Sequence, residues 1–468
     1  MGGPSGPPAR GPSEGAAVEI IPLVDEGLGN SSYLVEVGGG RALAVDPGRD
    51  PVPYRAEAER RGLRIAWTAE THLHADFVSG SRELEAAGAT ILAPAAGGID
   101  FPHRGLGHGD EIPVGDLTLR ALATPGHTPE HLAYLLLDGS RPLAVFTGGS
   151  LIVGSVARTD LIAPEETERL ARALYRSVRE HLLALPDDLP VYPTHGAGSF
   201  CSAPAGGERV TTIGRERATN PLLAAPDEDA FVAVLLGGLG TYPRYFLRLR
   251  EVNRLGPRVY GDAWPVLERL AVDDARQLLD GGAELIDARP IDRYAEGHIA
   301  GALSIALRPA FASWLGWLVE PDRPLIFVLD PEQDRAELVR QCLKIGYENV
   351  AGEFDGGMAA WHAAGFTMTR TPLVNADALA GRRILDIRQS SEFTAGHIPG
   401  ALNVELGSLD GNAEAVATGP VAVMCGHGER GMTGASLLER TGRSDVAVLR
   451  GGPPDWSRAT GGTLERTR

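Results

Sequence analysis

The sequence has few cysteines and no long apolar run, and each shortage excludes a class of protein. Its 468 residues contain three cysteines, Cys201, Cys342 and Cys425, too few and too scattered for a disulfide framework, which favours a reducing compartment. No stretch approaches the roughly 20 apolar residues of a membrane-spanning helix, and residues 1–15 lack the basic head and apolar core of a secretory signal. We therefore expect a cytoplasmic protein without a membrane segment.

Positive charge is also in short supply. The chain has 44 lysines and arginines against 61 aspartates and glutamates, a net charge of −17. A field of this sign repels phosphate backbones, so we expect no nucleic-acid partner. The length, at roughly 100–200 residues per domain, predicts about three domains.

The first of these domains is predicted over residues 18–255, after a Gly-, Pro- and Ser-rich flexible tail at residues 1–17. Short apolar runs typical of strands alternate there with helical patterns, which indicates an α/β layered domain. The predicted strands are residues 42–46, 65–68, 117–122 and 143–146, and the predicted helices are residues 82–87 and 165–185. A stretch rich in Gly, Pro and Arg, residues 237–262, is predicted to connect this domain to the next.

The remainder of the chain contains an internal repeat. Asp287-x-Arg289 with Gly297-His-Ile-x-Gly-Ala-Leu303 recurs as Asp386-x-Arg388 with Gly396-His-Ile-x-Gly-Ala-Leu402. An apolar strand, a loop, a helix and a Gly-Gly pair follow in each copy. Two α/β domains of related structure are therefore predicted, at residues 264–371 and 372–468.

Histidines follow several predicted strands of the first domain. His72, His74 and Asp76 lie in the segment Thr71-His-Leu-His-Ala-Asp-Phe77, and His127 and His195 each follow a later strand. Loops at strand ends are where α/β proteins place their sites, and imidazole nitrogen binds borderline metals. The pattern predicts a metal site, or the remains of one.

These residues resemble the metallo-β-lactamase superfamily, whose fold is an αββα sandwich and whose signature is H-x-H-x-D-H. The segments at residues 71–80, 124–131 and 195–199 are similar to its persulfide dioxygenase branch, often found fused to rhodanese domains. That branch holds one Fe(II) by two His and one Asp, and the resemblance implies His72 and His127 as the histidines. At the Asp position, in Phe146-Thr-Gly-Gly-Ser150, this chain has Gly149.

The missing carboxylate leaves three possibilities open. Water or an anion completes an iron site; His72, His74 and His127 hold a zinc ion in the three-histidine manner of catalytic sites; or the domain is a metal-free relic. Phe77 stands at the sixth position of the superfamily motif and argues against a second metal ion.

The last predicted domain contains a cysteine loop. Cys425-Gly-His-Gly-Glu-Arg430 follows the apolar strand Val421–Met424 and precedes a helical run at residues 432–440. Backbone N–H groups of such a loop, together with Arg430, would stabilise a thiolate or a terminal persulfide. Gly426, His427, Gly428 and Glu429 are the predicted substrate-binding residues of the loop.

Together with the repeated segments, this loop resembles a rhodanese domain, and the resemblance covers both repeats. It implies that Cys425 carries sulfur, that Arg430 binds an anionic donor, and that the first repeat is inactive because Asp330 stands at the cysteine position. Cys342 is predicted to be a packed structural thiol. Cys201 is predicted to line the mouth of the histidine site or to be a non-catalytic loop residue.

We therefore expect an enzyme of persulfide or thiosulfate metabolism, a sulfurtransferase acting through Cys425 with small thiols, persulfides or thiosulfate as partners. The alternatives are a non-catalytic sulfur-relay or scaffold protein with a relic metal domain, and a metal-dependent hydrolase of the metallo-β-lactamase superfamily. The oligomeric state, including a homo-oligomer, is left open.

Overall fold

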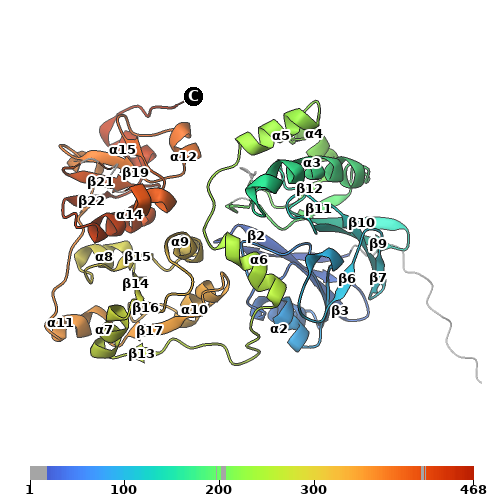
Figure 1. Cartoon of the computed structure of the whole chain (residues 1–468), viewed down its shortest axis with the longest axis horizontal. Coiled ribbons are helices and arrows are strands. Elements are labelled where there is room, and N and C mark those ends of the chain that lie inside the picture. The colour runs from blue at the N-terminus through green and yellow to red at the C-terminus, as the bar shows by residue number, and fades with distance from the viewer. Residues whose placement is uncertain (1–17, 197, 202–206, 413–415, 417, 468) are drawn as a thin grey trace, which may run out of the picture.

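The computed structural model describes residues 18–196, 198–201, 207–412, 416 and 418–467 (Figure 1). The predicted tail at residues 1–17 lies outside the described residues. The chain is mixed α/β, with one large layered domain followed by two smaller α/β domains of like topology. Among the described residues, no helix is both long enough and apolar enough to cross a bilayer.

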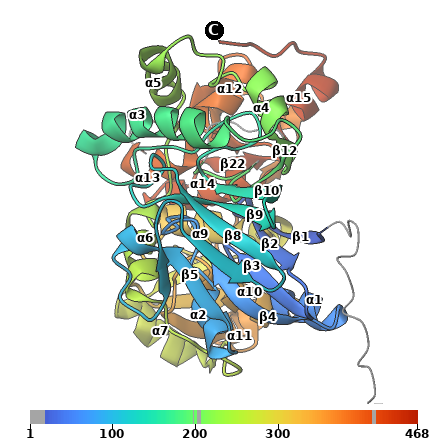
Figure 2. The same ribbon diagram turned by 90° about the vertical axis from the view of Figure 1, so that its right-hand side faces the viewer.

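Two six-stranded sheets form the centre of the first domain. Their strand orders are β1-β2-β3-β4-β5-β6 and β12-β11-β10-β9-β8-β7. Figure 2 shows α1 and α2 on one outer side of this pair of sheets and α3 on the other, which is the predicted αββα sandwich. The strands are β1 (Ile20–Asp25), β2 (Asn30–Glu36), β3 (Arg41–Val45), β4 (Arg64–Ala69), β5 (Thr90–Pro94), β6 (Arg104–Leu106), β7 (Glu111–Val114), β8 (Leu117–Ala123), β9 (Leu132–Asp138), β10 (Arg141–Gly148), β11 (Pro190–Pro193) and β12 (Thr211–Thr212).

The first domain also contains α-helices and shorter helical turns. They are α1 (Val52–Arg60), α2 (Ser81–Ala86), η1 (Ala95–Gly97), η2 (Pro164–Glu166), α3 (Thr167–Ser177), η3 (Val178–Leu182), α4 (Ile213–Thr219), α5 (Glu228–Gly237) and α6 (Phe246–Leu255). In α3, the buried residues Leu170, Ala171, Leu174 and Ser177 recur at helical spacing, so one face packs on the sheet. The single helix predicted over residues 165–185 is instead a 3-10 turn, α3 and a π-helical turn.

The two later domains share one sheet topology, as the internal repeat predicts. Their strand orders are β13-β17-β16-β14-β15 and β18-β22-β21-β19-β20, and every pairing is parallel. The first contains β13 (Arg269–Leu270), α7 (Val272–Asp280), β14 (Glu284–Asp287), α8 (Ile291–Glu296), β15 (Leu303–Ser304), α9 (Phe311–Leu318), β16 (Leu325–Val328), α10 (Arg335–Leu343), β17 (Val350–Phe354) and α11 (Gly357–Ala363). The second contains β18 (Leu373–Val374), η4 (Ala376–Ala378), β19 (Arg383–Asp386), α12 (Ser390–Ala395), β20 (Leu402–Asn403), η5 (Leu406–Ser408), α13 (Leu409–Asn412), β21 (Val421–Met424), α14 (Glu429–Arg440), β22 (Val446–Leu449) and α15 (Pro453–Thr460).

One apolar cluster joins the three domains. It contains Phe77 and Tyr245 from the first domain, Trp314 and Phe327 from the second and Met432 from the third. The segment predicted as a plain connection, residues 237–262, contains α6, whose Phe246 and Leu249 are buried. One face of α6 is therefore part of the core.

Candidate functional site

The histidine loop follows β4 directly, as the sequence predicts. His72 and His74 are at most 1% exposed, and their rings lie 4.2 Å apart, centre to centre. His72 Nε2 lies 3.4 Å from Nε2 of His195, which follows β11. The rings of His127 and His195 are 5.2 Å apart. The structure thus brings all four predicted histidines together.

His127 has one ring nitrogen fixed and one without a partner. Its Nδ1 donates to the carbonyl oxygen of Arg158 at 2.7 Å. A carbonyl only accepts, so the proton lies on Nδ1, and Nε2 has a lone pair. This buried Nε2 has no hydrogen-bond partner among the described residues. Burial lowers the pKa of His127 to about 3, which keeps the ring neutral.

Among the described residues, three overlapping sets of side chains could hold a metal ion, one of them Asp46, Glu70 and His74. The ligand atoms of His72, His74 and His195 lie within 4.8 Å of one another, and so do those of His127, His195 and Cys201. Two nitrogens bound to one tetrahedral ion at about 2.1 Å would lie about 3.4 Å apart, which is the separation of His72 Nε2 and His195 Nε2. Nε2 of His127 is also buried and has no partner among the described residues. His72, His127 and His195 therefore fit a metal ion bound through nitrogen.

His74 is held differently from its neighbours. Its Nε2 lies 3.2 Å from Asp46 Oδ1 and 3.1 Å from Glu70 Oε2. Burial opposes the charged form, but the carboxylate of Asp46, with that of Glu70, outweighs it and raises the pKa of His74 to about 10. The ring nitrogen is therefore placed to pair with these two carboxylates, and the same ring also belongs to two of the groups that could hold a metal ion.

Asp76 and Cys201 complete the buried cluster. Asp76 Oδ2 lies 3.2 Å from His195 Nδ1, and Cys201 is fully buried. Burial raises the pKa of the Cys201 thiol well above its usual range. Cys201 thus lies within the cluster, beside His127 and His195.

The position of the missing carboxylate is closed. A Cβ at Gly149 would lie 2.7 Å from Cδ2 of His127 and 2.8 Å from Cβ of Ala157. The backbone N–H of Gly149 donates to His131 Nε2 at 3.0 Å, which fixes the segment in place. The residues present therefore do not fit a facial triad with a carboxylate from position 149.

Sequence reasoning missed two residues that hold this site. Asp46, at the end of β3, accepts hydrogen bonds from Thr71 N at 2.7 Å and from Thr194 Oγ1, and so ties two ligand loops together. Asn253 of α6 donates to the carbonyl oxygens of His74 at 2.8 Å and Phe77 at 2.9 Å. The run Ala44-Val-Asp-Pro-Gly48 at a strand end was an available signal for Asp46. No local pattern indicates Asn253.

The cysteine loop joins β21 to α14, as predicted, although α14 begins at Glu429 rather than at residue 432. Cys425 is buried, and its Sγ accepts a hydrogen bond from the backbone N–H of Gly428 at 3.1 Å. Gly428 has φ 112°, a left-handed conformation that glycine tolerates and that turns this N–H toward the sulfur. Of the other loop residues, His427 is exposed, and Gly426 and Glu429 are half-buried.

Two residues hold Arg430 beside this loop. Its Nη1 and Nη2 pair with the carboxylate of Glu392 at 2.7 and 2.8 Å. Its Cζ lies 5.9 Å from the ring centre of Trp314, which belongs to α9 of the preceding repeat. The guanidinium that was predicted to bind a donor is thus already paired within the protein, and donor binding by it remains a prediction.

The equivalent loop of the first repeat is built differently. Asp330 stands where the second repeat has Cys425, and its backbone N–H donates to Gln333 Oε1 at 2.8 Å. Arg335 Nη1 donates to the carbonyl oxygens of Asp330 and Gln333. Cys342 is fully buried in α10, and burial raises its thiol pKa, which agrees with a packed structural residue.

Comparisons with known families agree with this division of the chain. The metallo-beta-lactamase superfamily model matches residues 25–195, and the rhodanese-like domain model matches residues 271–364 and 373–459. The fold and the histidine cluster therefore define a metallo-β-lactamase domain joined to two rhodanese-like domains.

Two curated relatives show which members of the superfamily the chain is similar to. The chain is 32% identical to mitochondrial persulfide dioxygenase ETHE1 of Homo sapiens over 198 residues, which cover 42% of this chain and 70% of that protein. It is 34% identical to hydroxyacylglutathione hydrolase of Methylococcus capsulatus over 183 residues, 37% of this chain and 64% of that protein. The chain belongs to the persulfide dioxygenase family, with tandem rhodanese-like domains, and these likenesses support a role in sulfur metabolism.

A solved structure extends the likeness beyond the first domain. The crystal structure of a metallo-beta-lactamase from Staphylococcus aureus subsp. aureus COL superposes with a TM-score of 0.65 at 29% identity. It covers 72% of this chain and 99% of that chain. The shared region is therefore larger than either family match alone.

Proposed function

We propose that this protein transfers sulfane sulfur through a persulfide on Cys425, with a small persulfide or thiosulfate as donor and a small thiol as acceptor. The observation that carries the proposal is the N–H of Gly428, 3.1 Å from Cys425 Sγ at the start of α14. A backbone dipole and a helix N-terminus both stabilise negative charge on sulfur. The same groups would stabilise the terminal sulfur of a cysteine persulfide.

The reaction is covalent catalysis in two balanced steps. With thiosulfate, the Cys425 thiolate attacks the outer sulfur, the S–S bond of the donor breaks and sulfite leaves with the bonding electrons. With cyanide as acceptor, its carbon attacks the terminal sulfur of the persulfide, thiocyanate leaves, and the thiolate is restored. The Gly428 N–H would stabilise the Cys425 thiolate that attacks in the first step and is restored in the second.

The test is thiocyanate formation from thiosulfate and cyanide by the full chain. Cys425→Ser is expected to abolish it, because an alcohol carries no sulfane sulfur, whereas the buried Cys342→Ser variant is the matched control and is expected to retain it. Mass spectrometry of the donor-treated protein should show one added sulfur atom on Cys425. Unchanged turnover in Cys425→Ser would refute the proposal.

We propose further that His72, His127 and His195 hold a single Fe(II) ion in the first domain. When bound, iron would supply oxygen activation for oxidation of a persulfide sulfur, the activity in the name of the ETHE1 relatives. His72 and His127 remain neutral and able to bind a metal, Arg158 fixes the tautomer of His127, and Asp46 fixes the two ligand loops.

Metal analysis and oxygen uptake test the iron proposal. The purified protein should contain about one iron per chain, lose most of it in His195→Ala, and consume oxygen with glutathione persulfide. Protein without iron or oxygen uptake would leave the metal-free relic as the account of this domain. The Cys425 proposal is independent of that outcome.

A further inference from the structure

Cys201 lies inside the histidine cluster rather than at its mouth. Cys201 and His127 are 0% exposed, and His195 is 1% exposed. One ligand atom from each of the three lies within 4.8 Å of the other two. Nε2 of His127 has no hydrogen-bond partner among the described residues. A buried thiol thus adjoins a buried lone pair that nothing in the described part of the chain satisfies.

Cys201 also adjoins the position of the missing carboxylate. The carbonyl oxygen of Gly149 accepts a hydrogen bond from the backbone N–H of Ala157 at 2.9 Å. The carbonyl oxygen of Cys201 accepts one from the backbone N–H of Arg158 at 3.0 Å. Gly149 and Cys201 are therefore bonded to consecutive residues of one segment. The thiol belongs to the side of the site from which the carboxylate is absent.

Arg158 fixes the thiol and the nearest histidine relative to each other. Its carbonyl oxygen accepts from His127 Nδ1 at 2.7 Å, its backbone N–H holds Cys201, and its Nη1 donates to the carbonyl oxygen of Phe200 at 3.0 Å. Arg158 is itself 3% exposed and pairs with both oxygens of Asp160, at 2.7 and 2.8 Å. This arrangement orients the two side chains before any ion is bound, which a metal site requires.

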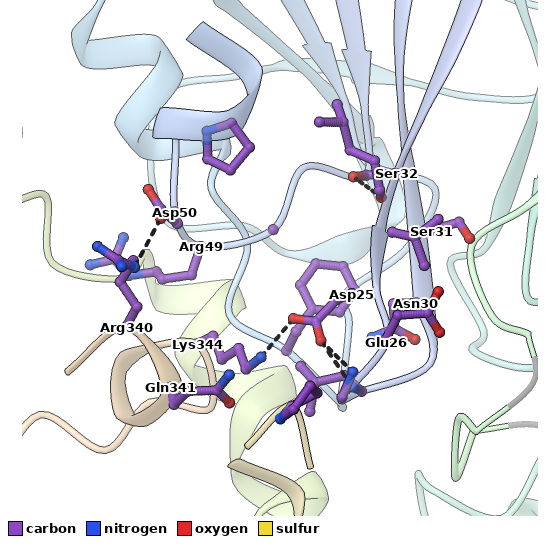
Figure 3. Close-up of a pocket in the computed structure, with 18 of the residues that line it drawn as sticks. Asp25, Glu26, Asn30, Ser31, Ser32, Arg49, Asp50, Arg340, Gln341 and Lys344 are labelled. Carbon is purple, nitrogen blue, oxygen red and sulfur yellow. Dashed lines mark hydrogen bonds and ion pairs between the residues drawn. The ribbon is translucent and has the colours of Figure 1, made fainter. Parts of the chain in front are cut away.

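His195 presents its Nε2 to the same space. Its Nδ1 lies 3.2 Å from Asn30 Oδ1 and 3.2 Å from Asp76 Oδ2. Both oxygens accept, so the proton lies on Nδ1 and Nε2 has a lone pair. Asn30 belongs to the wall of a cavity of about 510 Å³ between the first domain and the first repeat (Figure 3). The hydrogen-bonded side of the His195 ring thus faces Asn30, and Nε2 faces His72 Nε2 at 3.4 Å.

The charge of a bound ion requires an anionic ligand in this buried place. Neutral imidazoles leave a dication uncompensated, and an uncompensated charge is costly to bury. The facial triad solves this with a carboxylate, but position 149 is closed to a side chain. Asp76 belongs to none of the described groups whose ligand atoms gather within 4.8 Å. The thiolate of Cys201 would carry the same single negative charge into the cluster.

We propose that the Cys201 thiolate binds the metal ion of the first domain in place of a carboxylate from position 149, together with His72, His127 and His195. On binding, the S–H bond breaks, the proton passes to solvent, and sulfur donates the electron pair to the ion, whose oxidation state is unchanged. At a tetrahedral ion with bonds of about 2.1 Å to nitrogen and about 2.3 Å to sulfur, these atoms would lie about 3.6 Å apart. Cys201 Sγ therefore has at most about 1.2 Å to close from the 4.8 Å limit. That an ion is bound at all rests on the metal site proposed above.

The test is the optical spectrum of the full chain, freed of metal by a chelator and loaded with one equivalent of Co(II). Wild type should show visible ligand-field bands together with a near-ultraviolet charge-transfer band from thiolate to cobalt. Cys201→Ser should lose the charge-transfer band and bind Co(II) at least about tenfold more weakly, because even an outer-shell partner is worth about 10–100-fold. Cys342→Ser removes another fully buried thiol and is the matched control, which should keep the band.

X-ray absorption of the zinc-loaded wild type tests the same proposal without a variant. One sulfur atom should appear at about 2.3 Å from the ion, beside nitrogen at about 2.0–2.1 Å. The Cys425→Ser chain should give the same result, which excludes zinc bound at the cysteine loop. A coordination shell of nitrogen and oxygen alone would overturn the proposal, even if Cys201→Ser failed to fold.

The outcomes separate this proposal from the earlier ones. Co(II) bound with ligand-field bands but no charge-transfer band, or a band that persists in Cys201→Ser, would overturn the role of Cys201 and leave the histidine site standing. Protein that bound no Co(II) would overturn the histidine site and the role of Cys201 together. Thiocyanate formation by the same preparations reports on Cys425 separately, so sulfur transfer stands or falls on its own assay.

Discussion

Gly149 lies beside the histidine site, where there is no room for even a Cβ atom. His127 and Ala157 fill the space that a side chain at this position would need. His127 cannot move aside freely, because its Nδ1 is bonded to the backbone of Arg158. The backbone around Gly149 is thus too closely packed to admit a side chain without a shift of its neighbours.

Substitution of Gly149 tests this packing directly. Gly149→Ala should lower the free energy of unfolding by about 1–3 kcal/mol, the usual cost of overpacking a buried site, and Gly149→Asp should lower it further without gaining iron. Urea unfolding and metal analysis measure the two effects. Gly207→Ala is the control, because a Cβ there meets no atom of the described residues within 4 Å.

A Gly149→Ala protein as stable as the Gly207→Ala control would show that the neighbours give way easily. Gly149→Asp protein with more iron than wild type would show that the carboxylate corner is still open. Either result would contradict the packing around His127.

The residues within the motifs could be predicted from the sequence, but the distant residues that hold the motif loops in place could not. His72, His127, His195 and Cys425 each stand in a short segment whose chemistry is readable locally. Asn253 holds the carbonyls of His74 and Phe77 from more than 170 positions away along the chain. Such a contact depends on tertiary packing, which a single sequence does not reveal.

At the scale of elements, the two rhodanese repeats differ in the loop between a central strand and its following helix. In the second repeat, the Gly428 N–H reaches Cys425 Sγ because glycine accepts φ 112°. In the first, Gln333 occupies the equivalent place, and its side chain bonds the backbone N–H of Asp330. The first loop is therefore closed by its own side chains.

A cysteine alone should not convert the first repeat into a sulfur carrier. Asp330→Cys in a Cys425→Ser background should form no thiocyanate and gain no sulfur by mass spectrometry, because no glycine at position 333 presents an N–H to the thiol. Asp330→Cys with Cys425 intact is the control and should work as wild type does. Sulfur bound at position 330 of the double variant would mean that the loop geometry is unimportant.

The shared α/β fold of the repeats and one central strand of each followed from the sequence, and α6 did not. The Gly-, Pro- and Arg-rich composition of residues 237–262 predicted a connection, yet Phe246 and Leu249 of α6 are buried against the rest of the protein. Composition averages over a segment, whereas burial depends on which faces meet in the fold. Asn253 lies in the same helix. The helix and the role of Asn253 at the histidine loop were therefore missed for the same reason, which is that both depend on tertiary packing.

Across the whole molecule, a run of contacts joins the histidine cluster to the cysteine loop. The backbone carbonyl oxygen of Arg158 accepts a hydrogen bond from His127 Nδ1. The side chain of Arg158 donates through Nη1 to the carbonyl oxygen of Phe200 at 3.0 Å. The Phe200 ring packs edge-on against Trp314, with ring centres 6.5 Å apart, and Trp314 lies beside Arg430. The repeat that has Asp330 in place of the loop cysteine thus supplies Trp314, which lies in the run of contacts between the two sites.

We therefore expect Trp314 to be a positioning residue for sulfur transfer at Cys425. Trp314→Leu removes the aromatic face near the Arg430 guanidinium, a contact worth about 0.5–1 kcal/mol at exposed sites and more when desolvated. The specificity constant kcat/KM for thiosulfate should fall about two- to fivefold. Trp314→Phe keeps a ring there and should restore most of it.

Trp317→Leu separates this role from general damage to the interface. Trp317 also packs against Phe200, with ring centres 5.4 Å apart, and it is buried like Trp314. Among the described residues, Trp314 is the one aromatic ring that lies over Arg430. Trp317→Leu should therefore lower thermal stability to a similar extent while leaving kcat/KM per folded molecule nearly unchanged. Equal losses of kcat/KM in Trp314→Leu and Trp317→Leu would contradict a positioning role for Trp314. So would a Trp314→Phe variant that does not recover, because its ring still offers an aromatic face to Arg430. Either result would mean that Trp314 only packs the interface.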